Sequence, residues 1–132
     1  MGYLLDTNIV SAFLKNDLRI SLKFEEKRYK GETIAINAIT YYEIKRGLLR
    51  INAKKKLTLF ETFCQIYPVL FLDNLEIFEK ASEIHADLVK RGQIIQDADI
   101  LIASTAIIHK LTLVSHDSDL TRIKDLHLEN WL

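Results

Sequence analysis

The sequence predicts an α/β fold, a single three-layer α/β/α domain in which helices cover both faces of a central parallel sheet. Short apolar segments alternate with amphipathic helical segments along the whole chain, which is the pattern of a parallel sheet. The 132 residues suit one domain with its own core, covering residues 1–132. A composition of 48% hydrophobic and 27% charged residues, with one proline and four glycines, indicates a globular chain.

The strands are predicted from short apolar or alternating segments that are rich in β-branched residues. The segment "ETIAIN" alternates polar and apolar residues, and "LTLV" follows the most apolar helical segment of the chain. Strands are expected at residues 2–5, 32–37, 68–72, 111–114 and near 126–129.

The helices are predicted from apolar residues spaced three and four apart. They are expected at residues 8–14, 18–30, 38–48, 53–66, 75–90 and 97–110. In the second of these helices, Leu18, Leu22 and Phe24 are expected to face the core. Thr40 is the expected N-cap of the third helix and Asp97 that of the last, because hydroxyl and carboxylate oxygens accept hydrogen bonds from the free amides at a helix start.

The sequence indicates a cytoplasmic protein that has no membrane partner. No apolar run reaches the roughly 18 to 20 residues that span a membrane. The first residues lack the basic region and cleavage site of a secretory signal. The single cysteine, Cys64, has no partner for an internal disulfide and is expected to fill core space in a reducing compartment.

The formal net charge is zero, so contact with a polyanion would need a local basic patch. One stretch of the chain gathers cations with no acid among them: Lys45, Arg46, Arg50, Lys54, Lys55 and Lys56. A solvated helix face and loop explains this stretch most simply. Binding of a nucleic-acid backbone is the alternative.

Two carboxylates in the first third of the chain stand near element boundaries. Asp6 directly follows the first strand, and in parallel sheets functional residues gather beyond the carboxyl ends of strands. Asp6 could equally cap the helix that follows it. Glu43 closes the segment "TYYE", which fits a capping box, although a glutamate in the first turn can also face a pocket.

Three more carboxylates follow in the last third of the chain. Asp99 lies on the same side of its helix as Ile102, where a carboxylate is costly unless a cation is near. Asp117 and Asp119 follow the strand at 111–114 and could be ordinary turn residues. An EF-hand is excluded, because the segment has no glycine at the sixth position and no acid at the twelfth.

The acid-bearing segments would meet in one crevice if the sheet brings these strand ends together. Several carboxylates cannot all stay ionised close together without raised pKa values or bound cations. Oxygen-only ligands favour Mg²⁺ or Mn²⁺. Such ions commonly activate water and stabilise charge in phosphate chemistry. The acids therefore indicate a metal-dependent reaction at a phosphate.

Four segments, in this order and spacing, resemble the PIN-domain ribonucleases: "LLDTNIV", "TYYEIKRG", "DADILIASTA" and "LTLVSHDSDLTRI" with the following "LHLENW". The likeness is greatest to the VapC-type toxins of type II toxin–antitoxin pairs and covers nearly the whole chain. It implies a PIN-like domain, a parallel sheet with flanking helices. It also implies cleavage of RNA, either tRNA or ribosomal RNA, by water activated at Mg²⁺ or Mn²⁺.

By this resemblance, four residues match the acids of the family's metal site: Asp6, Glu43, Asp99 and Asp117. They are the expected catalytic and metal-binding residues. Three neighbours would position a carboxylate or nearby water through hydrogen bonds: Thr7, Asn8 and Ser115. Asp119 could be an auxiliary acid, Gly47 completes the family's E-x-x-x-G motif, and His116 departs from the usual pattern.

The resemblance also implies partners. Members of the family pair as homodimers, act on RNA and are silenced by a small antitoxin protein. The basic stretch would then hold the RNA backbone through four cations: Lys45, Arg46, Arg50 and Lys54.

Two alternatives stay open at this point. A receiver-like phosphoryl-transfer domain has comparable length and class, with Asp73 after "VLFL" as its phosphorylated residue. Only one acid lies near the first strand, however, and no lysine ends the strand at 111–114. The second alternative is a catalytically inactive PIN module that binds RNA or protein, with its acids serving as caps and turns.

Overall fold

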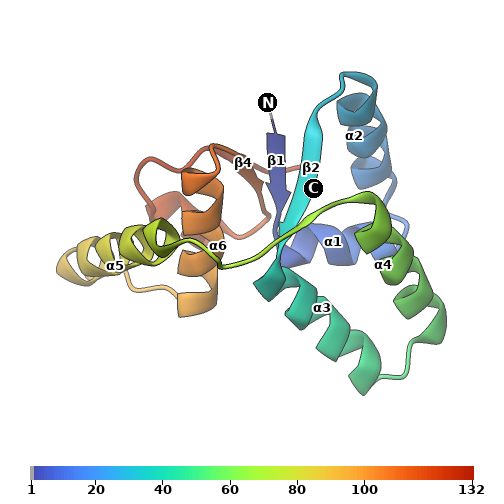
Figure 1. The fold of residues 1–132 in the computed structure, drawn as a ribbon, viewed down its shortest axis with the longest axis horizontal. Coiled ribbons are helices and arrows are strands. Elements are labelled where there is room, and N and C mark those ends of the chain that lie inside the picture. Colours follow the sequence, from blue (N-terminus) through green and yellow to red (C-terminus); the bar gives the residue numbers. More distant parts are fainter. Residues whose placement is uncertain (1) are drawn as a thin grey trace.

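Across residues 2–132, which the computed structural model describes, five parallel strands form one sheet between two layers of helices (Figure 1). The strand order is β3-β2-β1-β4-β5. The strands are β1 (Gly2–Leu5), β2 (Thr33–Asn37), β3 (Val69–Leu70), β4 (Thr112–Val114) and β5 (Leu128–Glu129). The predicted fold class is confirmed. The two edge strands are shorter than expected, and short edge strands limit unwanted pairing with other chains.

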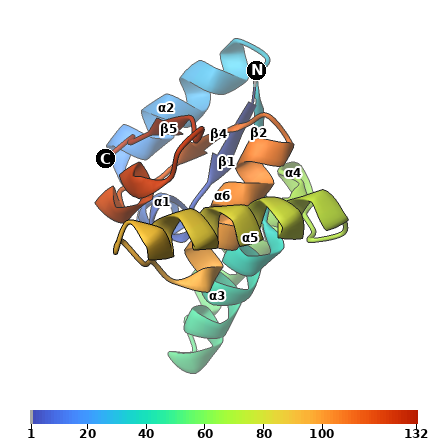
Figure 2. The same ribbon diagram turned by 90° about the vertical axis from the view of Figure 1, so that its left-hand side faces the viewer.

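Each predicted helix is present, within two residues of its predicted bounds. The helices are α1 (Thr7–Leu14), α2 (Leu18–Tyr29), α3 (Ala38–Arg50), α4 (Lys54–Ile66), α5 (Leu75–Lys90) and α6 (Asp97–Ile108). The turn predicted after β4 contains a short 3-10 helix, η1 (Ser118–Arg122). Figure 2 shows α5 lying across α6 on one face of the sheet. Among residues 2–132, no helix is long and apolar enough to cross a membrane.

The central strand β1 is buried on both faces and divides the core into two parts. Tyr3 and Leu5 pack with α1 to α4, whereas Leu4 packs with α5 and α6. Successive side chains of a strand point to opposite faces, so a run of apolar residues fills both layers. β1 therefore ends inside the molecule, where the chain must turn into α1.

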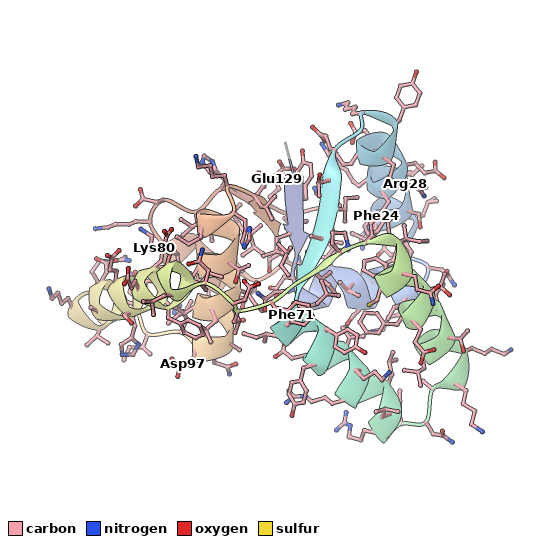
Figure 3. The ribbon with its side chains drawn as sticks, in the orientation of Figure 1. Phe24, Arg28, Phe71, Lys80, Asp97 and Glu129 are labelled. Carbon is pink, nitrogen blue, oxygen red and sulfur yellow. The ribbon has the colours of Figure 1, made fainter. Side chains whose placement is uncertain are left out.

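The inward face of α2 differs from the prediction. Leu18 and Leu22 are 69% and 56% exposed, while Ile20 is buried in their place. Phe24 is buried, as predicted. The ring of Phe24 stacks on Phe13 at 4.8 Å and lies between α2 and α4 (Figure 3). Aromatic packing thus sets the rotation of this helix, since a large ring gains more from burial than a leucine does.

The N-cap of α3 is Asn37, so the prediction of Thr40 is wrong. The Asn37 side-chain oxygen accepts a hydrogen bond from the Ile39 amide at 2.8 Å. Its amide nitrogen donates to the Thr105 hydroxyl on α6, also at 2.8 Å. Thr40 is instead buried within the helix. The helix begins earlier because Asn37, the last residue of β2, already supplies the capping oxygen.

The predicted N-cap of α6 is also wrong. Gln96 occupies the cap position without a side-chain hydrogen bond, and Asp97 is the first helical residue. Asp97 is exposed at the outer end of the helix (Figure 3). A carboxylate in the first turn still gains from the positive end of the helix dipole.

We expect Asn37→Ala to lower the free energy of unfolding by about 2 kcal/mol, because it removes both a cap and a buried hydrogen bond. Urea unfolding measures the change. Asn74→Ala is the matched control, since Asn74 caps α5 through the Glu76 amide at 2.9 Å but is exposed. That control should lose only about 1 kcal/mol. Equal losses in the two variants would show that the Asn37–Thr105 hydrogen bond adds nothing to the free energy of unfolding.

Candidate active site

The strand order reverses between β1 and β4, because β2 and β3 extend from one side of β1 and β4 and β5 from the other. In parallel sheets, chains that leave such a point diverge and open a crevice beyond the strand ends. Asp6 follows β1, and Ser115 follows β4 at the same edge. The Asp6 amide donates to the Val114 carbonyl at 2.9 Å, which holds the two strand ends together.

Asp6 is both a helix cap and a member of this crevice. It is 5% exposed, and its Oδ1 accepts a hydrogen bond from the Thr7 amide at 2.8 Å. Its Oδ2 accepts from the Ser115 hydroxyl at 2.7 Å and from the Asn8 amide group at 3.3 Å. Burial raises the pKa of Asp6, and the bonds from Ser115 and Thr7 oppose that rise. Asp6 can therefore be a helix cap and a site residue at once, because Oδ1 caps α1 while Oδ2 contacts the other side chains of the crevice.

Asn8 and Ser115 connect the loop after β4 to the start of α1. The Asn8 amide group donates to the Ser115 hydroxyl at 3.2 Å, and Asn8 Oδ1 accepts from the His116 amide at 2.9 Å. The Ser115 hydroxyl also accepts from the Asp117 amide at 3.0 Å. These contacts fix Asp117 relative to Asp6. His116 contributes its backbone here, and its ring lies 3.1 Å from the Asn130 amide group.

Glu43 contacts α1 rather than its own helix start. The Thr7 hydroxyl donates to Glu43 Oε1 at 2.6 Å. Because α3 begins at Ala38, Glu43 lies in the second turn, too far along for a capping box. The capping-box interpretation is therefore wrong, and Glu43 faces the same region as Asp6.

Asp99 carries the largest electrostatic effect in the crevice. Burial, followed by the negative charges of Asp6, Asp117 and Glu43, raises its pKa to about 6. Asp99 also lines a shallow pocket together with Asp117 and Asp119. Four segments that are distant in sequence thus place their carboxylates within electrostatic reach of one another.

Asp119 is less available to bind a cation than the other acids are. Its Oδ1 lies 3.1 Å from an Arg122 guanidinium nitrogen, which partly neutralises it. Its amide donates to the Asp117 side chain at 2.9 Å, so Asp117 also caps η1. Asp117 and Asp119 are therefore turn residues, which is one of the two interpretations of the sequence, and they also border the acid crevice.

The donor set fits a hard cation that keeps much of its hydration shell. Within residues 2–132, no three carboxylate, imidazole or thiolate groups lie close enough together to ligate one ion directly. Mg²⁺ typically contacts only one or two protein carboxylates and retains several waters. Asp99, whose pKa is raised by burial and then by the neighbouring carboxylates, is the group whose ionised form a nearby cation would stabilise most.

The structure separates the cations of the basic stretch. Lys45 lies 3.7 Å from Glu61, and the Arg46 guanidinium lies over the Tyr42 ring at 5.0 Å. Lys54 is exposed in the first turn of α4. Arg50 alone among the four predicted RNA-binding residues lines a groove that also contains Thr7 and Glu43. The stretch is therefore not one continuous patch.

This groove, named here the α1–α3 groove, has a volume of about 330 Å³. Its lining residues are Thr7, Ser11, Leu14, Lys15, Glu43, Ile44, Gly47, Leu48, Arg50, Ile51 and Lys56. Lys15 was not among the residues predicted to bind RNA. Only the spacing of Lys15 could have indicated its place in the groove, because Lys15 lies two helical turns beyond Thr7 and on the same face.

We expect Gly47→Ala to raise the free energy of unfolding by about 0.5 to 1 kcal/mol, since glycine disfavours a helix interior by that amount. Gly47 lies inside α3, and an added Cβ would meet no atom within 4 Å. Urea unfolding of the variant and the parent measures the gain. A loss of stability in Gly47→Ala would show that the added methyl group does not fit beside α3.

Known proteins share both the sequence pattern and the fold of this chain. The family model described as PIN domain matches residues 3–126. The chain belongs to the PIN domain family. Ribonuclease VapC2 of Rickettsia felis is 32% identical over 139 residues, covering 99% of this chain and 98% of that protein. Ribonuclease VapC1 of Methanocaldococcus jannaschii is 31% identical over 127 residues, covering 96% and 84%.

A solved structure agrees with these relatives. The crystal structure of VapBC2 from Rickettsia felis, bound to a DNA fragment from its promoter, superposes on this PIN domain with a TM-score of 0.91. The two chains are 29% identical, and the match covers 100% of each. Within its family, this PIN domain groups with the VapC ribonucleases, as the sequence motifs predicted.

The receiver-like alternative is wrong. A receiver sheet places the third strand beside the first, in the order 2-1-3-4-5. In this PIN domain β3 lies at the edge and contacts β2. Asp73, which follows β3, is exposed and lies at the start of the segment that leads to α5.

Proposed function

We propose that this PIN domain is an endoribonuclease that depends on Mg²⁺ or Mn²⁺ and hydrolyses phosphodiester bonds of tRNA or ribosomal RNA. The observation that carries the proposal is the mutual electrostatic influence of Asp6, Glu43, Asp99 and Asp117. Burial, and after it the neighbouring carboxylates, raise the pKa of Asp99 to about 6. The acids that face one another in the crevice therefore carry a surplus of negative charge that a divalent cation would neutralise.

In this proposal, each residue of the crevice has a separate task. Four carboxylates hold the ion, directly or through its waters: Asp6, Glu43, Asp99 and Asp117. A bound divalent ion lowers the pKa of its water and stabilises the charge that develops at phosphorus. Ser115 and Asn8 orient the Asp6 carboxylate, and Thr7 orients Glu43. Asp119 is an auxiliary acid whose negative charge Arg122 moderates.

The proposed partners are an RNA substrate, a small antitoxin protein and a second copy of this chain. The antitoxin is supported by the related solved structures, which are VapBC complexes. Pairing of two copies is supported by apolar side chains exposed around the start of α5, namely Phe71, Leu75 and Phe78. We propose that the protein acts in the cytoplasm, where tRNA and ribosomal RNA are available as substrates.

Metal removal tests the proposed reaction. The purified protein is incubated with total tRNA, and separately with ribosomal RNA, in Mg²⁺, in Mn²⁺ and in excess EDTA. We expect discrete fragments with either ion and intact RNA in EDTA, with cutting restored when the ion is added back. RNA that is bound but never cut would contradict the proposal and favour the inactive RNA-binding module.

A further inference from the structure

The α1–α3 groove begins at the acid crevice. One wall comes from α1 and its C-cap residue, with Thr7, Ser11 and Lys15 at successive turns of one face. The other wall comes from α3, with Glu43, Gly47 and Arg50 spaced in the same way. The hydrogen bond from Thr7 to Glu43, at 2.6 Å, closes the end of the groove nearest the acids. The groove extends from there for about 12 Å, the rise of eight helical residues.

The far end of the groove is positively charged. Lys15 and Arg50 are exposed, and Lys56 joins them from α4. None of these three cations forms an ion pair within residues 2–132, whereas Lys45 of the same basic stretch is paired with Glu61. Among the residues that the structure describes, Glu43 is the only acid that lines the groove, and it lies at the end where the proposed cation would bind. This distribution of charge suits an anionic chain that starts at a metal ion.

Gly47 provides a second, independent observation. It occupies the interior of α3, where glycine is unfavourable, and a Cβ added to it would meet no atom within 4 Å beyond the neighbouring backbone of its own helix. Its missing side chain lowers the groove wall midway between Glu43 and Arg50. Glycine at such a place often lets another backbone or a ligand approach closely. The open space therefore lies on the path from the acids to the cations.

We propose that the α1–α3 groove holds the single-stranded RNA segment beside the cleaved bond, with its phosphates near Lys15, Arg50 and Lys56 and its backbone passing over Gly47. This inference rests on the proposed function and adds the direction in which the RNA leaves the acid crevice. The groove has a volume of about 330 Å³, which is within the range of sites that hold a small ligand unit. The contacts are to phosphates, so they hold RNA of any sequence.

Added bulk at Gly47 tests the path. Binding of a short fluorescein-labelled single-stranded RNA is measured by anisotropy in the Asp6→Asn background, so that the RNA stays intact. We expect Gly47→Leu to weaken binding at least about tenfold, because its side chain fills the groove. Gly47→Ala is the matched control and should lose much less. Equal affinities for Gly47→Leu and its parent would overturn the proposal.

The salt dependence of binding tests the cations. For a single strand, the slope of log K against log salt becomes shallower by about 0.7 for each phosphate that the protein no longer neutralises. We expect this reduction for Lys15→Gln and for Arg50→Gln. Lys30→Gln is the control, because Lys30 lies between α2 and β2 at the opposite edge of the sheet. Unchanged slopes for Lys15→Gln and Arg50→Gln would overturn the assignment.

Further measurements separate this inference from the proposed function. Isothermal titration with Mn²⁺ should give the same affinity for Gly47→Leu and for wild type, because Gly47 offers no ligand. If wild type cuts RNA and the groove variants cut and bind equally well, the inference fails while the proposed function stands. If wild type neither binds nor cuts RNA, both fail. Groove variants that keep RNA binding but no longer bind a protein antitoxin would assign the groove to that partner.

Discussion

Asp6→Asn is expected to lower the rate of RNA cleavage by about a hundredfold to a thousandfold while the fold is retained. The substitution replaces one carboxylate oxygen with an amide nitrogen, which cannot ligate a cation. The remaining oxygen can still accept the hydrogen bond from the Thr7 amide, so the cap of α1 survives. Single-turnover cleavage of tRNA in Mg²⁺ measures the loss.

The control for this variant is Asp73→Asn. It makes the same chemical change at an exposed aspartate next to the edge strand β3. We expect Asp73→Asn to cut RNA at the wild-type rate. Thermal melting of both variants checks that each is folded. Equal cutting by wild type and Asp6→Asn would show that Asp6 is not part of the active site or that the activity is a contaminant.

Asp99→Asn is expected to stabilise the metal-free protein at neutral pH by about 1 to 2 kcal/mol, after allowance for the partial exposure of the side chain. Burial and neighbouring carboxylates raise the pKa of Asp99 in the folded state to about 6. The folded state therefore binds a proton more tightly than the unfolded state. As the pH rises from about 4 through about 6, wild type loses stability because Asp99 must ionise among like charges.

The variant should consequently match wild type near pH 4 and become the more stable protein as the pH approaches 7. Urea unfolding in EDTA across this range measures the difference. Added Mg²⁺ should then raise the melting temperature of wild type and leave the melting temperature of Asp99→Asn nearly unchanged. A ligand stabilises a protein only when the folded state of that protein binds it. A pH-independent difference, or equal stabilisation of both proteins by Mg²⁺, would contradict the role of Asp99 as a metal ligand.

The candidate site was predictable in its residue types but not in its contacts. Asp6 and Asp117 could be placed at one sheet edge, because the carboxyl ends of parallel strands meet there. The contact between Thr7 and Glu43 joins residues 36 positions apart, and no local pattern contains it. The N-cap of α3 was misplaced for a related reason. "TYYE" is a valid local signal, but Asn37 caps the helix earlier and is held by Thr105 on a distant helix.

The sequence by itself determined the alternation of strands and helices, and with it the parallel sheet and the edge on which Asp6 lies. Periodic burial is a local property, so it can be read from neighbouring residues. Only the tertiary structure decided the strand order, and therefore the reversal between β1 and β4 where the crevice opens. It also paired Lys45 with Glu61 and left Lys15 beside Arg50 in the α1–α3 groove. Strand pairing and helix packing join distant segments, and their energies depend on partners that a local pattern does not specify.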